Sequence, residues 1–60
     1  MFGLRDRVRI KVGGSDVWTV EQIIDNEDGK KYSVELNGDF LSRRWKTESE
    51  LELVEKAEKP

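Results

Sequence analysis

Cysteine and histidine are both absent from this 60-residue sequence. Without cysteine, the chain has no disulfide and no thiolate to serve as nucleophile or metal ligand. Without histidine, it lacks the commonest general base, the commonest zinc ligand and the side chain that titrates near neutral pH. The carboxylate pairs Glu27–Asp28 and Glu48–Glu50 lie in expected turns, where solvated acids are ordinary. We therefore expect neither enzyme activity nor a bound metal or cofactor.

Long apolar runs are also missing. No stretch approaches the ~18 apolar residues of a membrane-spanning helix, and residues 1–4 are too short for a signal peptide. We expect no membrane segment and a cytoplasmic location. Sixty residues allow one domain, and a domain of this size buries only about 60% of the surface that its unfolded chain exposes.

Charge is plentiful, and its two signs are separated along the sequence. Charged residues make up 40% of the chain, and the net charge is −2. Residues 1–12 and 40–47 are basic, whereas residues 13–39 and 48–60 are acidic. A protein that binds nucleic acid by charge alone is usually basic overall, so the composition favours another kind of partner. The strand pairing decides whether the two basic segments merge into one patch.

The first strand is predicted at residues 7–12, where apolar and basic residues alternate strictly. This alternation places Val8, Ile10 and Val12 on the inner face and the cations on the other. Residues 13–16, Gly-Gly-Ser-Asp, predict the following turn or loop.

A second strand is predicted at residues 17–25, which are rich in β-branched and aromatic residues. Trp18 and Val20 share one face, but the adjacent Ile23 and Ile24 break the alternation. One extra residue near Glu21–Gln22 would return Ile23 to the inner face, so we expect a bulge or a strong bend there.

Two hairpins are predicted next. Residues 26–30 contain an Asp-Gly step, and residues 37–38 are Asn-Gly, the strongest short hairpin signal. Between these turns, residues 31–36 alternate with three side chains inward: Tyr32, Val34 and Leu36. In residues 39–47, one face is expected to be inward and carries Leu41, Arg43 and Trp45. The other face of that strand carries Phe40, Ser42, Arg44 and Lys46.

The C-terminal part begins with T-E-S-E at residues 47–50, which has the form of a capping box and predicts a single 3₁₀ turn. Residues 51–54 would be the last strand, with Leu51 and Leu53 inward, and residues 55–60 a charged, frayed tail. Five strands in so short a chain predict an all-β, five-stranded SH3-like barrel over residues 1–54.

Two stretches resemble the YodC-like family of small uncharacterised bacterial proteins. In the first, a strand with basic residues (8–12) runs into Gly13–Gly14 and then into the pattern T-V-x-x-I at residues 19–23. The second combines Y-S-V-E-L at residues 32–36, Leu41, Trp45 and S-E-L-E-L-V at residues 49–54. The chain departs from the family pattern where W-K-T (45–47) replaces an aromatic-proline step and Glu35–Leu36 replaces a common aromatic.

This resemblance covers roughly residues 7–54. It implies an SH3-like fold and supplies neither a known function nor a catalytic residue. KOW, Tudor and integrase C-terminal barrels share the general layout and differ widely in function, so the fold leaves the function open.

The segment at residues 40–46, F-L-S-R-R-W-K, is the best candidate for a binding surface. Its outward residues would include Phe40, Arg44 and Lys46. Arg43 lies on the face expected to be inward, so its side chain would reach solvent at the barrel end, or a bulge would change the register and turn it outward. Cations of this kind neutralise phosphates, and exposed aromatic rings stack on bases. Alternatively, Trp45 is a core residue.

The first predicted strand adds Arg7 and Arg9 to the candidate residues. These cations either extend the basic surface or pair with glutamates of the last strand, because the first and last strands pair in SH3-like barrels. Trp18 follows the loop at residues 13–16 and is either a core residue or an anchor beside a binding groove.

We expect a non-catalytic binding module or small accessory subunit that recognises a protein partner. The alternative is low-affinity nucleic-acid binding through the basic-aromatic strand. The expected oligomeric state is a monomer or a weak homodimer, since edge strands of so small a sheet can pair between copies.

Overall fold

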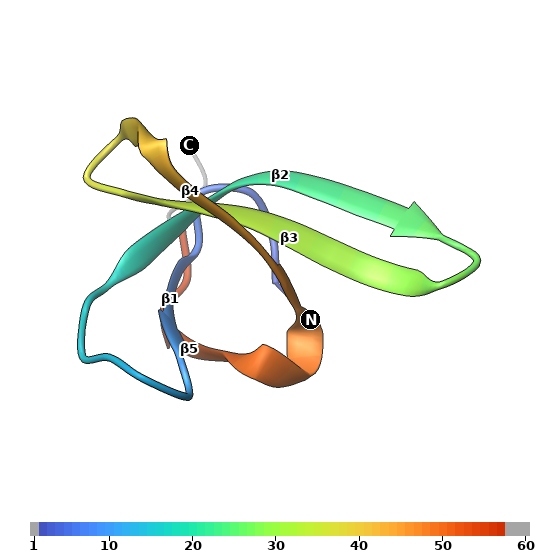
Figure 1. Ribbon diagram of the computed structural model, residues 1–60, viewed down its shortest axis with the longest axis horizontal. Helices are drawn as coiled ribbons and strands as arrows, with labels where there is room; N and C mark the ends of the chain where they lie inside the picture. Colours follow the sequence, from blue (N-terminus) through green and yellow to red (C-terminus); the bar gives the residue numbers. More distant parts are fainter. Residues whose placement is uncertain (1, 58–60) are drawn as a thin grey trace.

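Residues 2–57 are described by the structure, a computed structural model. Its strands are β1 (Arg7–Ile10), β2 (Trp18–Asn26), β3 (Gly29–Leu36), β4 (Asp39–Thr47) and β5 (Leu51–Glu55), with the 3₁₀ turn η1 (Glu48–Glu50) before β5. They form one antiparallel sheet in the order β4-β3-β2-β1-β5 (Figure 1). The all-β class, the five strands and the 3₁₀ turn are confirmed. The sheet is open, with β4 at one edge and β5 at the other. No helix within residues 2–57 has the length and apolar character needed to cross a membrane.

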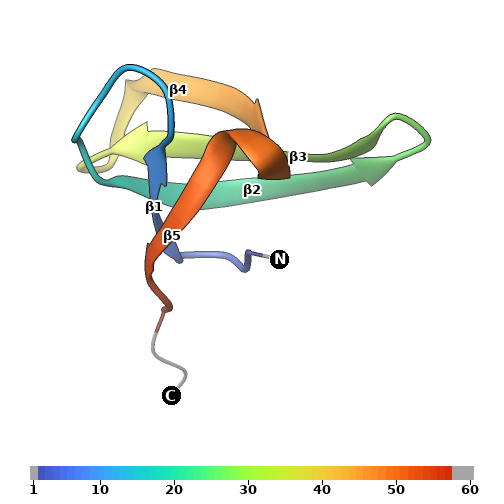
Figure 2. The same ribbon diagram turned by 90° about the horizontal axis from the view of Figure 1, so that it is seen from below.

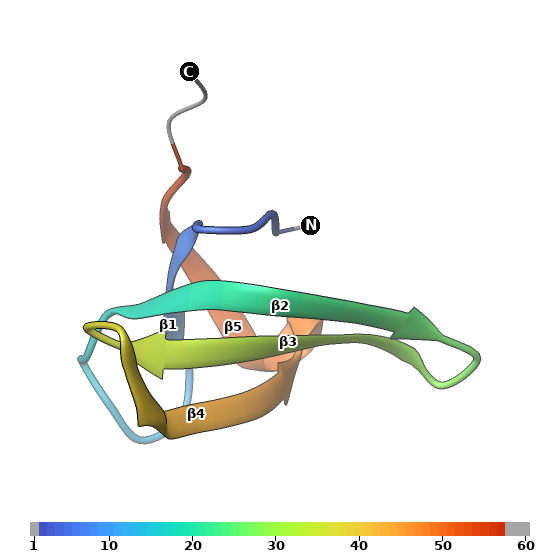
Figure 3. The same cartoon turned by 90° about the horizontal axis from the view of Figure 1, so that it is seen from above.

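Strand β2 joins the two parts of the sheet. It pairs with β1 near its start and with β3 along most of its length, and β1 and β5 run across the β2–β3 hairpin (Figures 2 and 3). The register between β2 and β3 shifts between Val20 and Gln22, which confirms the bulge expected near Glu21–Gln22. The extra residue brings both Val20 and Ile23 to the core side, because it resets the alternation of side chains.

The two hairpin turns follow their sequence signals. Asn37 and Gly38 both have positive φ, 50° and 74°, as a two-residue turn between twisted strands requires. In the β2–β3 turn, the Asn26 side-chain oxygen accepts a hydrogen bond from the Asp28 backbone N–H at 2.9 Å. Gly29 then re-enters the ladder with φ 108°, a conformation that a glycine adopts at little cost.

The core consists of five buried apolar side chains from four strands: Val8, Val20, Tyr32, Val34 and Leu51. Four partly buried side chains pack against them: Phe2, Ile10, Trp18 and Ile23. The Phe2 ring meets the Tyr32 ring edge to face, with centroids 5.3 Å apart and an interplanar angle of 78°. No apolar residue of β4 belongs to this core.

Four of the expected core residues are exposed instead. Val12 is 87% exposed because β1 ends at Ile10 and Val12 lies in the following turn. Leu41 is 83% exposed and Trp45 is 42% exposed, so their predicted inward orientation is wrong. Alternation correctly puts Arg44 and Trp45 on opposite faces of β4, but it does not say which face covers the core. Leu53 lies opposite buried Val8, yet it is 41% exposed, so its predicted inward orientation is also wrong.

The Asp6 side chain connects the two ends of the described chain. Its carboxylate is 2% exposed and accepts hydrogen bonds from the backbone N–H groups of Gly3 and Ala57, both at 2.8 Å. Lys56 Nζ lies 3.9 Å from the same carboxylate. Of the expected tail at residues 55–60, Glu55 therefore completes β5 and Ala57 is bonded to Asp6, whereas residues 58–60 lie outside the described part.

Candidate binding surface on β4

Strand β4 exposes three large apolar side chains. Phe40 is 65%, Leu41 83% and Trp45 42% exposed. Together with Arg43 and Arg44 they form what we call the β4 surface, a row of apolar and basic groups on an edge strand. Single exposed apolar residues are common in proteins, so the interest of this strand lies in the three that it exposes together, which make it the candidate contact surface.

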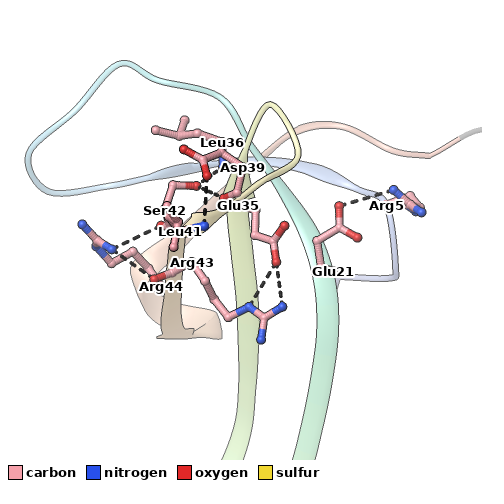
Figure 4. A network of polar contacts seen from close by, with 9 residues as sticks. All are labelled: Arg5, Glu21, Glu35, Leu36, Asp39, Leu41, Ser42, Arg43 and Arg44. Carbon is pink, nitrogen blue, oxygen red and sulfur yellow. Dashed lines mark hydrogen bonds and ion pairs between the residues drawn. The ribbon is translucent and has the colours of Figure 1, made fainter.

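The start of β4 bulges away from β3. Val34 lies opposite Arg44 and Leu36 opposite Asp39, so Glu35 alone spans the four residues 40–43. The Ser42 hydroxyl fills the gap, because it accepts a hydrogen bond from the Leu36 backbone N–H at 2.8 Å and donates one to the Asp39 carbonyl (Figure 4). The bulge holds the backbone of residues 40–43 away from the regular ladder.

Within this bulge, Arg43 is tied to a buried carboxylate. Its Nε and Nη2 donate to the same Glu35 oxygen at 3.0 and 2.9 Å, and Glu35 is 6% exposed (Figure 4). The Arg43 guanidinium carbon also lies 5.4 Å from the centre of the Phe40 ring, in cation–π contact. These contacts fix Arg43 and help to hold Phe40 in place, so both are parts of a preorganised surface.

Arg44 points away from Glu35 (Figure 4). Its Nη1 donates to the backbone carbonyl oxygens of Ser42 and Arg43, at 3.2 and 3.0 Å. Within residues 2–57 it has no carboxylate partner. Arg44 is therefore the β4 cation that is available to an incoming acidic group.

The register between β3 and β4 assigns opposite faces to neighbouring side chains. Arg44 lies opposite the core residue Val34, and Trp45 lies opposite Ser33. Since cross-strand partners share a face, Arg44 lies on the core side of the sheet and Trp45 on its outer side. Because β4 is an edge strand, Arg44 extends past the core to solvent.

The remaining candidate residues lie elsewhere. Lys46 Nζ is 4.0 Å from Glu50, and Arg9 on β1 is 3.5 Å from Glu52 on β5, which confirms the expected pairing of first-strand cations with last-strand glutamates. Arg7 is exposed on β1, and Trp18 is partly buried against the core. The structure thus brings Phe40, Arg43 and Arg44 together on β4. Trp18 lies on β2 and Arg7 and Arg9 on β1, and β3 lies between these strands and β4.

The two basic segments approach each other at one place. Lys11 and Lys46 both line a surface hollow of about 440 Å³, together with Ile10, Val12, Ser49 and Glu50. Glu50 lines the same hollow and pairs with Lys46, so its negative charge keeps the two lysines from forming a continuous positive patch.

The 3₁₀ turn at the end of β4 is closed by a capping box. Glu50 accepts hydrogen bonds from the Thr47 backbone N–H at 2.9 Å and from the Thr47 hydroxyl at 3.0 Å. Both bonds lower the pKa of Glu50 below its ordinary value, and the bond from the Thr47 backbone has the larger effect. Nearby, burial raises the pKa of Tyr32, whose hydroxyl donates to Glu48 at 3.0 Å.

Sequence reasoning missed two buried carboxylates, Glu35 and Asp6. The alternation of β3 places Glu35 on the outer face, and only the bulge of β4 brings Arg43 over it. One signal for Glu35 was available in the sequence. The alternation of residues 39–47 put Arg43 on the face expected to be inward, and a partly buried arginine requires a carboxylate partner. No local pattern indicated Asp6, because one of its partners is 51 residues away along the chain.

Comparisons with known proteins add no relationship to this picture. No family model matches the chain, and neither the curated proteins nor the solved structures include a match. Residues 2–57 contain no group of three or more carboxylates placed to hold a metal ion.

Proposed function

We propose that this protein is a non-catalytic binding module that recognises a protein partner through the β4 surface. One observation carries this proposal. β4 is a nine-residue edge strand that exposes three large apolar side chains and contributes none to the core. The partly buried Arg43 and its Glu35 contact keep that surface ordered before a partner arrives, which lowers the entropy lost on binding.

For the fold, we propose an SH3-like barrel. Three features support it: β5 pairs with β1, β2 is shared between two parts of the sheet, and a 3₁₀ turn precedes the last strand. A binding role is common for small barrels of this kind, although the fold alone does not specify the ligand. The proposal of a binding role therefore depends on the β4 surface and not on the fold.

A protein partner is better supported than a nucleic acid. Several cations of the two basic segments are already paired with glutamates, namely Arg5 with Glu21, Arg9 with Glu52, Arg43 with Glu35 and Lys46 with Glu50. Each such pair reduces the positive charge available to a phosphate backbone. Exposed leucine adds apolar contact area, which a protein partner buries more effectively than a nucleic acid does.

Selection of peptides from a random phage-displayed library on the immobilised protein tests the proposal. We expect enriched peptides whose affinity falls at least about fivefold with the substitution Leu41→Ser, since removing a central apolar anchor costs more than about 1 kcal/mol of binding. Val12→Ser is the matched control, because Val12 is equally exposed but lies in the β1–β2 turn. Thermal melting of both variants confirms that they fold.

Two results would contradict the proposal. One is the absence of any enriched peptide that distinguishes Leu41→Ser from the control. The other is tight binding of mixed DNA or RNA oligomers at ~50 mM salt, with an affinity that falls steeply as salt is added, which would indicate a nucleic-acid ligand instead.

A further inference from the structure

We infer that the partner adds to the β4 edge as an extended strand in which acidic and apolar residues alternate. This inference rests on the proposed function, and it names the conformation and the chemistry of the bound segment. Three features of the edge carry it: its backbone, the position of Arg44, and the different character of the two faces of β4.

The backbone of β4 is open on the side away from β3. β4 is the last strand of the sheet in this direction, and it is nine residues long with no proline. An edge strand presents unpaired N–H and C=O groups that a further strand can take up, as in known cases of peptide binding by strand addition. Proteins normally protect such edges with bulges and charged side chains. β4 has both, at residues 40–43 and at Arg44, but it also exposes Leu41 and Trp45.

Arg44 now covers part of this edge. Its guanidinium bonds the carbonyl oxygens of Ser42 and Arg43, and both bonds are to neutral acceptors. A carboxylate from a partner would form a stronger, charge-assisted bond with Arg44 and draw it away from these carbonyls. A carbonyl released in this way would then be free to accept an N–H group of the same partner strand. The guanidinium thus favours an acidic strand over a neutral or basic one.

The register of β4 determines the spacing of the acidic residues. Arg44 and Lys46 lie opposite Val34 and Tyr32, whereas Trp45 lies opposite Ser33 on the other face. A strand beside β4 meets Arg44 on one face, next to Lys46 in its pair with Glu50, and the indole on the other face. Alternating acidic and apolar residues match both faces at once, which is the reason for the proposed pattern.

A second copy of β4 does not fit this pattern. Antiparallel pairing of two β4 strands brings the cations Arg43, Arg44 and Lys46 of both copies together, and like charges across a strand pair are destabilising. β5 has the opposite charge, with Glu52, Glu55 and the exposed Leu53 and Val54. We commit to a separate acidic segment, and the experiment distinguishes it from β5 of another copy.

Fluorescence anisotropy with three labelled ten-residue peptides tests the inference. The first alternates Glu and Val, the second alternates Lys and Val, and the third is the Glu-Val peptide with its Val nitrogens methylated, which removes one edge of backbone donors. We expect the Glu-Val peptide to bind, and the Lys-Val and methylated peptides to bind at least about tenfold more weakly.

Charge reversal at Arg44 provides the decisive comparison. Arg44→Glu should weaken Glu-Val binding at least about tenfold and improve Lys-Val binding, because the charge that selects the partner is inverted. Arg7→Glu is the matched control: it makes the same change of charge at an exposed position on β1, and we expect less than about a twofold effect.

The outcomes separate this inference from the proposed function. Peptides that bind in a Leu41-dependent manner but respond neither to Arg44→Glu nor to methylation would overturn strand addition and leave a protein-binding β4 surface. Failure of every peptide, selected or synthetic, to depend on Leu41 would overturn both. Sedimentation that shows self-association, abolished by Glu55→Lys as well as by Arg44→Glu, would assign the edge to β5 of a second copy and overturn a separate partner.

Discussion

Strands β3 and β4 are neighbours in one ladder, yet their environments are opposite. In β3, the four consecutive residues Tyr32–Glu35 are all buried, whereas no residue of β4 is buried. Each strand contains three large apolar or aromatic residues, so composition does not explain the difference. Position does: β3 has a strand on each side and side chains over both faces, whereas β4 has one neighbour. Burial in this protein depends on a strand's place in the sheet more than on its own apolar pattern.

This difference in burial also suggests that β3 contributes mainly to stability and β4 mainly to binding. β3 supplies two of the five core residues, so changes there should affect folding. β4 supplies exposed apolar groups, so changes to these side chains should affect binding with little effect on folding. Substitutions at three positions, Tyr32, Arg43 and Glu50, taken from the largest expected effect to the smallest, test where this division holds.

The largest effect is expected from the core of β3. Tyr32→Ala should lower the free energy of unfolding by about 3–4 kcal/mol, because it removes a fully buried ring and its contact with Phe2. Leu41→Ala on β4 should change it by less than about 0.5 kcal/mol. Urea denaturation followed by tryptophan fluorescence measures both variants. Equal losses for the two substitutions would contradict the division between β3 and β4.

The milder substitution Tyr32→Phe separates the ring from its hydroxyl. It keeps the buried ring and removes the hydrogen bond to Glu48, so we expect a loss of only about 1 kcal/mol. A loss as large as that of Tyr32→Ala would show that the hydroxyl, rather than the packing of the ring, makes the main contribution.

An intermediate effect is expected where the two strands are joined by a charge pair. Arg43→Ala leaves the carboxylate of Glu35 buried without its guanidinium, which should lower the free energy of unfolding by about 2 kcal/mol. The double variant Glu35→Gln/Arg43→Ala should lose less than Arg43→Ala alone, because no unpaired charge stays buried. Additive losses in this double-mutant cycle would show that the two side chains do not act as a pair.

The smallest effect concerns the end of β4 and depends on pH. The pKa of Glu50 is lowered by its bonds from Thr47, so the folded state prefers the ionised carboxylate. Its contribution to stability is complete above the ordinary value of 4.5 and is lost as the pH falls through the lower folded-state pKa. The difference in urea midpoint between the wild type and Glu50→Gln should therefore shrink between about pH 6 and about pH 3.

Glu27→Gln, in the exposed β2–β3 turn, is the control for this pH series, because Glu27 caps no turn. A difference between the wild type and Glu50→Gln that stays constant over the whole pH range would mean that ionised Glu50 does not stabilise the end of β4.

Local patterns were sufficient for the strands and turns. The bounds of β4 agree with the predicted residues 39–47, and the Asn37–Gly38 turn and the Glu21–Gln22 bulge lie where glycine, asparagine and the break in alternation indicated them. These features depend on a few adjacent residues, whose allowed φ values and side-chain period act over short distances. The candidate surface was found in the same way, since residues 40–46 combine aromatic and basic side chains.

The sequence by itself determined that this chain forms five strands, where most of them turn, and which residues of each strand share a face. Only the tertiary structure decided which face of β4 covers the core, that Leu41 and Trp45 are exposed, and that Glu35 and Asp6 are buried with their partners. The physical reason is that alternation has a period of two and treats both faces alike. The choice between the faces comes from neighbouring strands, and an edge strand such as β4 has only one of them.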